Sequence, residues 1–235
     1  MSKRKKAVFC WSGGKDSSLA LHRTLHSAEW DIRYLLTTIN GNHKRISMHG
    51  VREELLDAQA SAIGIPQLKA YTYEANNAEY EKQMETILLK AKAEGIEHVL
   101  FGDIFLEDLR LYRENNLAKI GMQASFPLWK EDTHTLIDEF LQLGFQTITC
   151  CVSDSLLNEK HVGEIITKDF IDSLPVEVDP CGENGEFHTF CFDGPIFKEK
   201  VKFIKGENIY KPLSAADKLP DSKTNGFWYC ELIPG

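Results

Sequence analysis

Apolar and amphipathic stretches alternate through the first half of the chain. Short apolar runs predict strands at residues 7–11, 32–39, 67–72 and 98–105. Apolar residues at helical spacing predict helices at 51–64 and 78–95, and a helix-like pattern also begins directly after Gly13 and Gly14. Alternating helices and near-continuously apolar strands are typical of a parallel sheet covered by helices. The pattern therefore predicts an α/β fold with a doubly wound parallel sheet.

The pattern changes between residues 123 and 133, where Pro127 and a polar run interrupt it. Beyond this point the spacing predicts helices at 134–143 and 156–173, and a strand at 146–153. Residues 186–204 alternate as a half-exposed antiparallel strand does, and residues 226–233 predict a last strand. We therefore expect two domains, residues 1–125 with the parallel sheet and residues 126–235 with a smaller α+β fold.

Composition narrows the class of protein. The 235 residues carry a net charge of −8, which argues weakly against general nucleic-acid binding. The first apolar run is shorter than the roughly 7–15 residues of a secretory signal, and no run approaches the roughly 18 residues of a membrane helix. The six cysteines show no zinc-type spacing, so we expect them to pack as small apolar residues in a reducing compartment. These features predict a cytoplasmic protein without a membrane partner, and they leave a homo-oligomer open.

The stretch "SGGKDSS", residues 12–18, joins the first predicted strand to the first predicted helix. Backbone N–H groups at a helix N-terminus attract anions, and glycines at positions 13 and 14 let an anion approach the main chain. Ser12, Ser17 and Ser18 add hydroxyl donors, and Lys15 adds a mobile positive charge. The stretch fits neither the glycine–lysine loop of common nucleotide triphosphatases nor the dinucleotide fingerprint. A plain helix cap is the alternative, but six specified residues at this place favour a phosphate site.

Asp16 would be out of place in an anion site unless it holds a cation. Mg²⁺ in proteins takes one or two carboxylates together with phosphate oxygens. We therefore expect Asp16 to bind Mg²⁺ that in turn holds phosphate.

The "SGGKDS" stretch resembles the pyrophosphate loop of the ATP pyrophosphatases in the adenine-nucleotide α-hydrolase superfamily. Four further motifs make the chain similar to the diphthine–ammonia ligase (diphthamide synthase) family: "SMHGVR" (47–52), "FGDI" (101–104), "PLW" (127–129) and "CGENGEFHTFCFDGP" (181–195). The resemblance runs from Ala7 to about Phe197. It implies a HUP-type, Rossmann-like first domain that binds ATP and a second domain that binds the substrate.

The resemblance also implies a reaction. A substrate carboxylate would displace pyrophosphate from ATP, and ammonia would then attack the acyl-adenylate to give an amide and AMP. In the full diphthamide pathway the acceptor is diphthine on elongation factor 2; the acceptor stays open if the source lacks that pathway. Lys15 and Asp16, with Mg²⁺, would stabilise the charge of the leaving pyrophosphate. Ser12, Gly13, Gly14, Ser17, Ser18 and His49 would help to bind the nucleotide.

The block at residues 181–189 gathers polar side chains around two glycines. A carboxylate beside an imidazole can bind an amine or accept its proton. With the resemblance we assign substrate binding to Glu183, Asn184, Glu186 and His188, and a catalytic role to Glu186; a polar hairpin is the alternative. Many family members carry tyrosine and glutamate where this chain has Phe187 and His188, and glycine in place of Asn184, which leaves the identity of the acceptor open.

A third candidate follows the strand predicted at 98–105. Gly102 and Asp103 come at the expected ligand edge of the sheet, and Glu107 and Arg110 follow at helical spacing. We assign all four to substrate binding, with a turn and an exposed ion pair as the alternative.

Two other functions remain open at this stage. One is a different adenylating reaction on the same scaffold, such as tRNA modification, although the chain has no C-x-x-C pair. The other is a nucleotide sensor that binds ATP without turnover.

Overall fold

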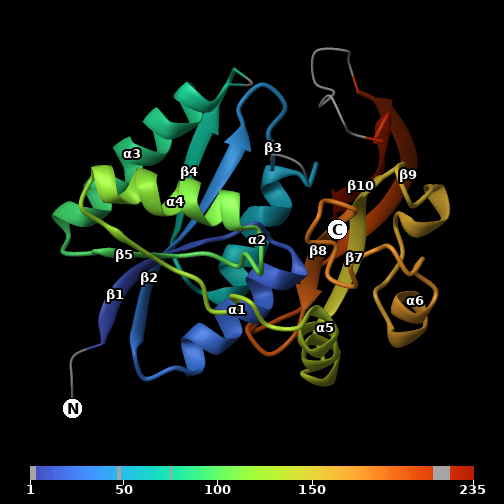
Figure 1. Cartoon of the computed structure of the whole chain (residues 1–235), viewed down its shortest axis with the longest axis horizontal. Coiled ribbons are helices and arrows are strands. Elements are labelled where there is room, and N and C mark those ends of the chain that lie inside the picture. Colours follow the sequence, from blue (N-terminus) through green and yellow to red (C-terminus); the bar gives the residue numbers. More distant parts are fainter. Residues whose placement is uncertain (1–3, 47–48, 75, 214–222) are drawn as a thin grey trace.

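A computed structural model describes residues 4–46, 49–74, 76–213 and 223–235, which form two sheets with helices around them (Figure 1). The first two residues of the "SMHGVR" motif, Ser47 and Met48, lie outside the described residues. The first sheet occupies the N-terminal half of the chain, and the second sheet occupies the C-terminal half.

The first sheet has five parallel strands and one short antiparallel strand. Its strands are β1 (Lys5–Cys10), β2 (Trp30–Asn40), β3 (Arg45–Ile46), β4 (Gln67–Thr72), β5 (His98–Leu100) and β6 (Gln123–Ser125). The helices between them are α1 (Lys15–His26), α2 (Glu53–Ile63), α3 (Asn77–Ala93) and α4 (Glu107–Lys119). The parallel strands lie in the order β4-β2-β1-β5-β6. This is the order of a doubly wound Rossmann-like sheet, so the predicted fold class is confirmed.

Apolar side chains from both faces of β1 explain why helices cover both sides. Phe9 and Trp11 belong to the core formed with α1 and α2, whereas Val8 belongs to a separate core formed with α3 and α4. In the register of the sheet, Phe9 pairs with Leu35 of β2 and Leu100 of β5. After β1 the chain moves to β2 on one side, and later to β5 on the other. The crevice beyond the end of β1 is therefore the switch point at which such sheets bind ligands.

The second sheet is antiparallel and has the order β8-β7-β10-β9. Its elements are α5 (Thr133–Gln142), β7 (Gln146–Ser153), the 3₁₀ turn η1 (Glu159–His161), α6 (Lys168–Asp172), β8 (Phe187–Asp193), β9 (Phe203–Pro212) and β10 (Gly226–Pro234). Phe187 and Phe190 of β8 belong to the same apolar core as α1 and α2. In Figure 1 this sheet stands beside α1 and α2, on the side away from α3 and α4.

Several predicted elements need correction. The helix predicted over residues 156–173 is confirmed only at its end, in α6, and for one turn, η1. Between them the backbone of Gly163 and Ile166 instead bonds to β7 through Thr149 and Thr147. The strand beginning at Phe187 is antiparallel, as predicted, but it is buried rather than half-exposed. The strand predicted over 98–105 ends at Leu100, and the short strands β3 and β6 were not predicted.

Candidate active site

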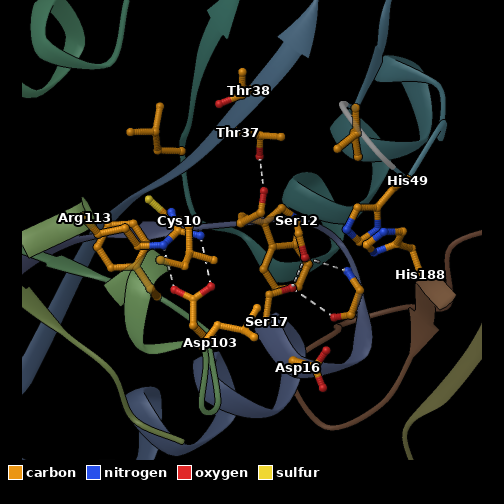
Figure 2. Close-up of a pocket in the computed structure, with 18 of the residues that line it drawn as sticks. Cys10, Ser12, Asp16, Ser17, Thr37, Thr38, His49, Asp103, Arg113 and His188 are labelled. Carbon is orange, nitrogen blue, oxygen red and sulfur yellow. Dashed lines mark hydrogen bonds and ion pairs between the residues drawn. The ribbon is translucent and has the colours of Figure 1, made fainter. Parts of the chain in front are cut away.

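A pocket of about 700 Å³ opens at the carboxyl ends of the parallel strands. Its walls come from the loop after β1, the end of β2, the turn after β5, helices α3 and α4, and residues 182–189 of the C-terminal half. Ten of the predicted site residues line it: Ser12, Gly14, Lys15, Asp16, Ser17, His49, Gly102, Asp103, Glu183 and His188. In Figure 2 the Asp103–Arg113 pair lies on one side of the loop after β1, and His49 and His188 lie on the other.

The loop after β1 holds its shape through short-range hydrogen bonds. Ser12 Oγ donates to Ser17 Oγ at 3.0 Å, and Ser17 Oγ donates to the Gly14 carbonyl at 2.9 Å. Gly13 has a φ of +79°, in the left-handed region that favours glycine, and an added Cβ would lie 2.5 Å from Gln59 Oε1. Ser18 is fully buried and donates to the Gly14 carbonyl. Gly13 and Ser18 therefore shape the loop from outside the pocket lining.

Gln59 is a positioning residue that the sequence did not reveal. Its side chain is fully buried on α2. Its amide accepts from Trp11 Nε1 at 3.1 Å and donates to the carbonyls of Gly13 at 2.9 Å and Cys191 at 2.6 Å. The Cys191 N–H also donates to the Gly13 carbonyl at 2.8 Å. This buried amide thus fixes the loop after β1 against β8, and no local pattern around residue 59 could have indicated it.

Lys15 and Asp16 form an ion pair at the start of α1. Lys15 Nζ lies 2.8 Å from Asp16 Oδ2, and it also donates to the Cys181 carbonyl. The lysine side chain is 3% exposed, because it is buried between two segments that hold it in place. The prediction that Lys15 carries a mobile charge is therefore wrong. Burial lowers the pKa of Lys15, but the Asp16 carboxylate, together with Cys181 and Glu183, outweighs burial, and the net shift is upward. Lys15 is therefore a fixed cation that joins the loop to the 181–189 block.

Asp16 keeps part of its carboxylate open to the pocket, with 30% of the side chain exposed. Burial raises the pKa of Asp16, and the Lys15 ammonium opposes that shift. Within the described ranges, no group of three or more histidine, cysteine or acidic side chains could hold a metal ion. One carboxylate is nevertheless the donor set that Mg²⁺ uses when phosphate and water complete its shell. The residues therefore fit Mg²⁺ that is bound together with a nucleotide.

Two neutral histidines lie over the start of α1. The His49 and His188 rings are 4.8 Å apart, and His49 Nδ1 lies 3.1 Å from the Thr189 carbonyl. A carbonyl only accepts, so Nδ1 carries the hydrogen and Nε2 is left as an acceptor. Burial lowers the pKa of His49 to about 4 and that of His188 well below its ordinary range. Both rings therefore act as uncharged hydrogen-bonding groups near pH 7.

Thr189, like Gln59, was not among the predicted site residues. Its Oγ1 accepts from the Lys15 N–H at 2.9 Å, which satisfies one of the free donors at the start of α1. Strand β8 therefore caps the helix that carries the candidate phosphate loop.

Glu183 is the acidic residue that the 181–189 block brings into the pocket. Its Oε1 accepts from the backbone N–H groups of Ile104 at 2.8 Å and Phe105 at 3.3 Å, after β5. Burial raises the pKa of Glu183 to about 7; the Ile104 hydrogen bond opposes the shift, and the nearby Asp16 charge adds to it. A carboxyl group with this pKa can accept and release a proton near neutral pH.

Glu186 and Asn184 do not reach the pocket lining. Glu186 is 5% exposed, and its Oε1 accepts from the Asp179 N–H at 3.0 Å and from Asn184 Nδ2 at 3.1 Å. Its other oxygen has no hydrogen-bond partner among the described residues. The geometry thus does not support the catalytic role expected for Glu186, because its side chain bonds to Asp179 and Asn184 within its own loop. Glu183, three residues earlier, is the glutamate that lines the pocket.

Asp103 lies at the end of β5 in a two-point ion pair with Arg113. Arg113 Nε is 2.7 Å from Asp103 Oδ2, and an Nη of Arg113 donates to Oδ1 at 3.0 Å. The guanidinium also lies over the Phe101 ring, 4.3 Å from its centroid. Arg113 was not predicted; its only local signal is that it follows Arg110 by one helical turn on α4.

Glu107 and Arg110 point elsewhere, outside the pocket lining. Glu107 pairs with Lys130 at 2.8 Å, and both side chains are more than half exposed. Arg110 pairs with Glu114 and lies over the Trp129 ring at 4.7 Å. Their expected contact with substrate thus lacks support from the geometry, because neither lines the pocket, whereas Arg113 does.

None of the helices in the described part of the chain is both long enough and apolar enough to span a membrane.

Comparison with known proteins gives consistent matches along the chain. Residues 5–124 match the family model "Diphthamide synthase N-terminal domain", and residues 132–216 match "Diphthamide synthase C-terminal domain". A diphthine–ammonia ligase of Danio rerio is 26% identical over 223 residues, which cover 84% of this chain and 86% of that protein. The diphthine–ammonia ligase of Homo sapiens is 29% identical over 130 residues, which cover 52% of this chain and 48% of that protein.

Among solved structures, a U34-tRNA thiolase from Methanococcus maripaludis aligns with a TM-score of 0.38 and 17% identity. The alignment covers 61% of this chain and 59% of that one.

Proposed function

The chain belongs to the diphthamide synthase family, and from this premise we propose that it is an ATP-dependent, AMP-forming ligase that joins ammonia to a carboxylate. The observation that carries the proposal is the meeting of two groups in one pocket. The "SGGKDS" loop lies at the switch point of the sheet, and Glu183, with a pKa of about 7, lies in the wall of the same pocket. A phosphate cradle beside a group that can take up a proton is what such a reaction requires.

In this proposal the start of α1 binds the phosphates of ATP. Ser12, Gly14, Lys15, Asp16 and Ser17 of this loop line the pocket. Phosphate oxygens would accept from N–H groups at the start of α1 and from the Ser12 and Ser17 hydroxyls, which would turn away from the bonds they make within the loop. Lys15 acts as a fixed charge behind the loop rather than as a mobile clamp, since it is buried and paired. The acceptor carboxylate would displace pyrophosphate, which leaves an acyl-adenylate for ammonia to attack.

Asp16 would hold Mg²⁺ together with the phosphates. When bound, the cation offsets the negative charge that builds on the leaving pyrophosphate.

Glu183 is the group we assign to proton transfer. Ammonia that attacks an acyl group must lose one proton before the amide is formed. The Glu183 carboxylate is anchored by two backbone N–H groups, faces the pocket and is deprotonated above about pH 7. It can therefore accept that proton.

The acceptor is proposed by class. The chain has relatives named diphthine–ammonia ligase. Diphthine carried on elongation factor 2 is therefore the first acceptor to test. The C-terminal half of the chain would contact that acceptor, because its residues 182–189 form one wall of the pocket.

Nucleotide product analysis tests the proposal directly. The purified chain would be incubated with ATP, Mg²⁺ and ammonium, with and without diphthine-bearing elongation factor 2. We expect repeated turnover to AMP and pyrophosphate only when both acceptor and ammonium are present. ADP and phosphate would show that a different bond is attacked, and ATP binding without turnover would favour a nucleotide sensor instead.

A further inference from the structure

A second, smaller recess of about 90 Å³ lies between α3 and α4. Its lining includes the exposed, charged side chains of Glu85 and Lys119, the partly exposed Glu81, and the apolar side chains of Leu88, Leu117 and Ile120. One water molecule takes up roughly 30 Å³ in the liquid. The recess therefore suits a few water-sized molecules, and it is too small for a nucleotide or a peptide.

The recess reaches the wall of the main pocket. Four residues line both cavities: Tyr80 and Met84 of α3, Phe101 after β5, and Arg113 of α4. The two cavities are therefore neighbours, with these four residues forming a shared partition. Met84 is unbranched and flexible, so this partition can open by a change of side-chain rotamer.

Resting on the proposed function, we propose that the recess between α3 and α4 is the route by which uncharged ammonia enters the pocket. The main mouth must admit both ATP and the acceptor, and once both are seated they cover it. The nucleophile then needs a separate entrance, which also keeps bulk water away from the activated carbonyl.

The partition between the recess and the main pocket favours the uncharged form. Glu81 and Glu85 line the recess and can attract ammonium there, but neither lines the main pocket. An ammonium ion that goes further loses hydration and needs a counter-charge to offset that cost. The charged side chain that lines both cavities is Arg113, a cation, and its partner Asp103 is already paired with it at two points. Ammonia carries no charge and pays no such cost, so it passes where ammonium does not.

The proton balance is simple. Ammonium gives one proton to the solvent at the rim, and ammonia enters. Its nitrogen forms the C–N bond as the C–O bond to AMP breaks, and a second proton leaves the nitrogen for Glu183. The products are the amide and AMP.

Filling the recess tests this route. Asn116→Trp places a large ring in the recess from α4, and Asn116 lines only the recess. Asn115→Trp is the matched control, because Asn115 is the adjacent, exposed asparagine on the same helix, outside both linings. Ile120→Phe is an independent filling change from the end of α4. The KM for ammonium chloride and the KM for ATP would be measured with diphthine-bearing elongation factor 2 as acceptor.

We expect Asn116→Trp and Ile120→Phe to raise the KM for ammonium at least tenfold while the KM for ATP stays within twofold of wild type. Asn115→Trp should match wild type in both. An unchanged KM for ammonium in the filled variants overturns the route while leaving the ligase reaction in place. Wild-type turnover that does not depend on ammonium overturns the proposed function itself, and the route with it.

Discussion

Two segments meet at the pocket and are held in different ways: the loop from Ser12 to Ser17 and the segment from Asp179 to Thr189. The side-chain bonds of the first are mostly local, such as Ser17 Oγ to the Gly14 carbonyl at 2.9 Å. The second depends more on distant partners: Asp179 accepts from Thr133 Oγ1 at 2.7 Å, and Glu183 accepts from the Ile104 N–H. Because one of the two segments depends on hydrogen bonds to residues distant in the sequence, the site should be sensitive to substitutions outside the pocket.

The largest effect is expected within the local loop, at Asp16. Asp16→Asn keeps the size of the side chain and removes the charge that would hold Mg²⁺. We expect Mg²⁺-dependent pyrophosphate release to fall about a thousandfold, since a bound metal supplies several kcal/mol of charge stabilisation. The measurement is the initial rate of pyrophosphate release across a Mg²⁺ titration.

Asp108→Asn is the matched control, because Asp108 also lies in the first turn of a helix but is exposed on α4. It should turn over like wild type. An Asp16→Asn protein with wild-type rates would remove the metal role from this residue.

The next effect separates two glutamates of the distant segment. Glu183→Gln should lower the rate of amide formation about 100- to 1000-fold, because it removes the group proposed to accept the proton. Glu186→Gln should lower it less than about tenfold, since glutamine can still accept from the Asp179 N–H. Single-turnover amide formation measures both, and a loss in Glu186→Gln as large as in Glu183→Gln would return the catalytic role to Glu186.

The pH dependence of the same variants sharpens this contrast. In wild type the rate should rise with pH through about 7, where Glu183 loses its proton, and Glu183→Gln should lack this rise. Stability should show the opposite sign. The pKa of Glu183 is higher in the folded protein than its ordinary value of 4.5. The unfolding free energy of wild type should therefore fall as the pH rises from about 4.5 to 7. Glu183→Gln should avoid that loss, which denaturant titrations at pH 5 and pH 8 would reveal.

The contrast between the segments also explains what could be predicted from the sequence. The parallel sheet and the placement of Ser12 to Ser17 followed from local patterns, because a strand, a glycine turn and a helix specify their own geometry. The 181–189 block was identified as part of the site, but the choice between Glu183 and Glu186 was not. That choice is made by the backbone N–H groups of Ile104 and Phe105, nearly 80 residues away in the chain.

Other errors have the same cause. Residues 156–173 carry helical spacing, yet the backbone around Gly163 finds partners on β7 instead. Arg110 was assigned to the site by its helical spacing from Glu107, but Arg113, on the same helix, is the one that lines the pocket, and only the packing of α4 decides this. Gln59 has no local signal, since its three partners come from Trp11, Gly13 and Cys191.

Gln59 is where the two segments can be uncoupled. Gln59→Leu keeps the volume and removes three buried hydrogen bonds, which should cost roughly 2–4 kcal/mol of unfolding free energy. The KM for ATP should rise as well, because the loop is no longer fixed against β8. Urea denaturation and ATP titration measure the two effects. Gln123→Leu, at an exposed glutamine, is the control and should change the unfolding free energy by less than about 0.5 kcal/mol. If Gln59→Leu is as stable as wild type, the two segments hold their positions independently.

The smallest effect is expected at Thr189, where β8 caps α1. Thr189→Val keeps the shape of the side chain and removes the acceptor for the Lys15 N–H, at a cost of about 1 kcal/mol. Thr167→Val removes the same kind of cap from α6, where Thr167 Oγ1 accepts from the Phe170 N–H at 3.2 Å, and should cost a similar amount. Only Thr189→Val should also weaken ATP binding, by a fewfold in a calorimetric titration, because only α1 begins at the phosphate loop. If both variants lose stability and neither loses affinity for ATP, the cap serves the fold alone, and the second sheet acts on the nucleotide through Gln59 and Lys15 rather than through Thr189.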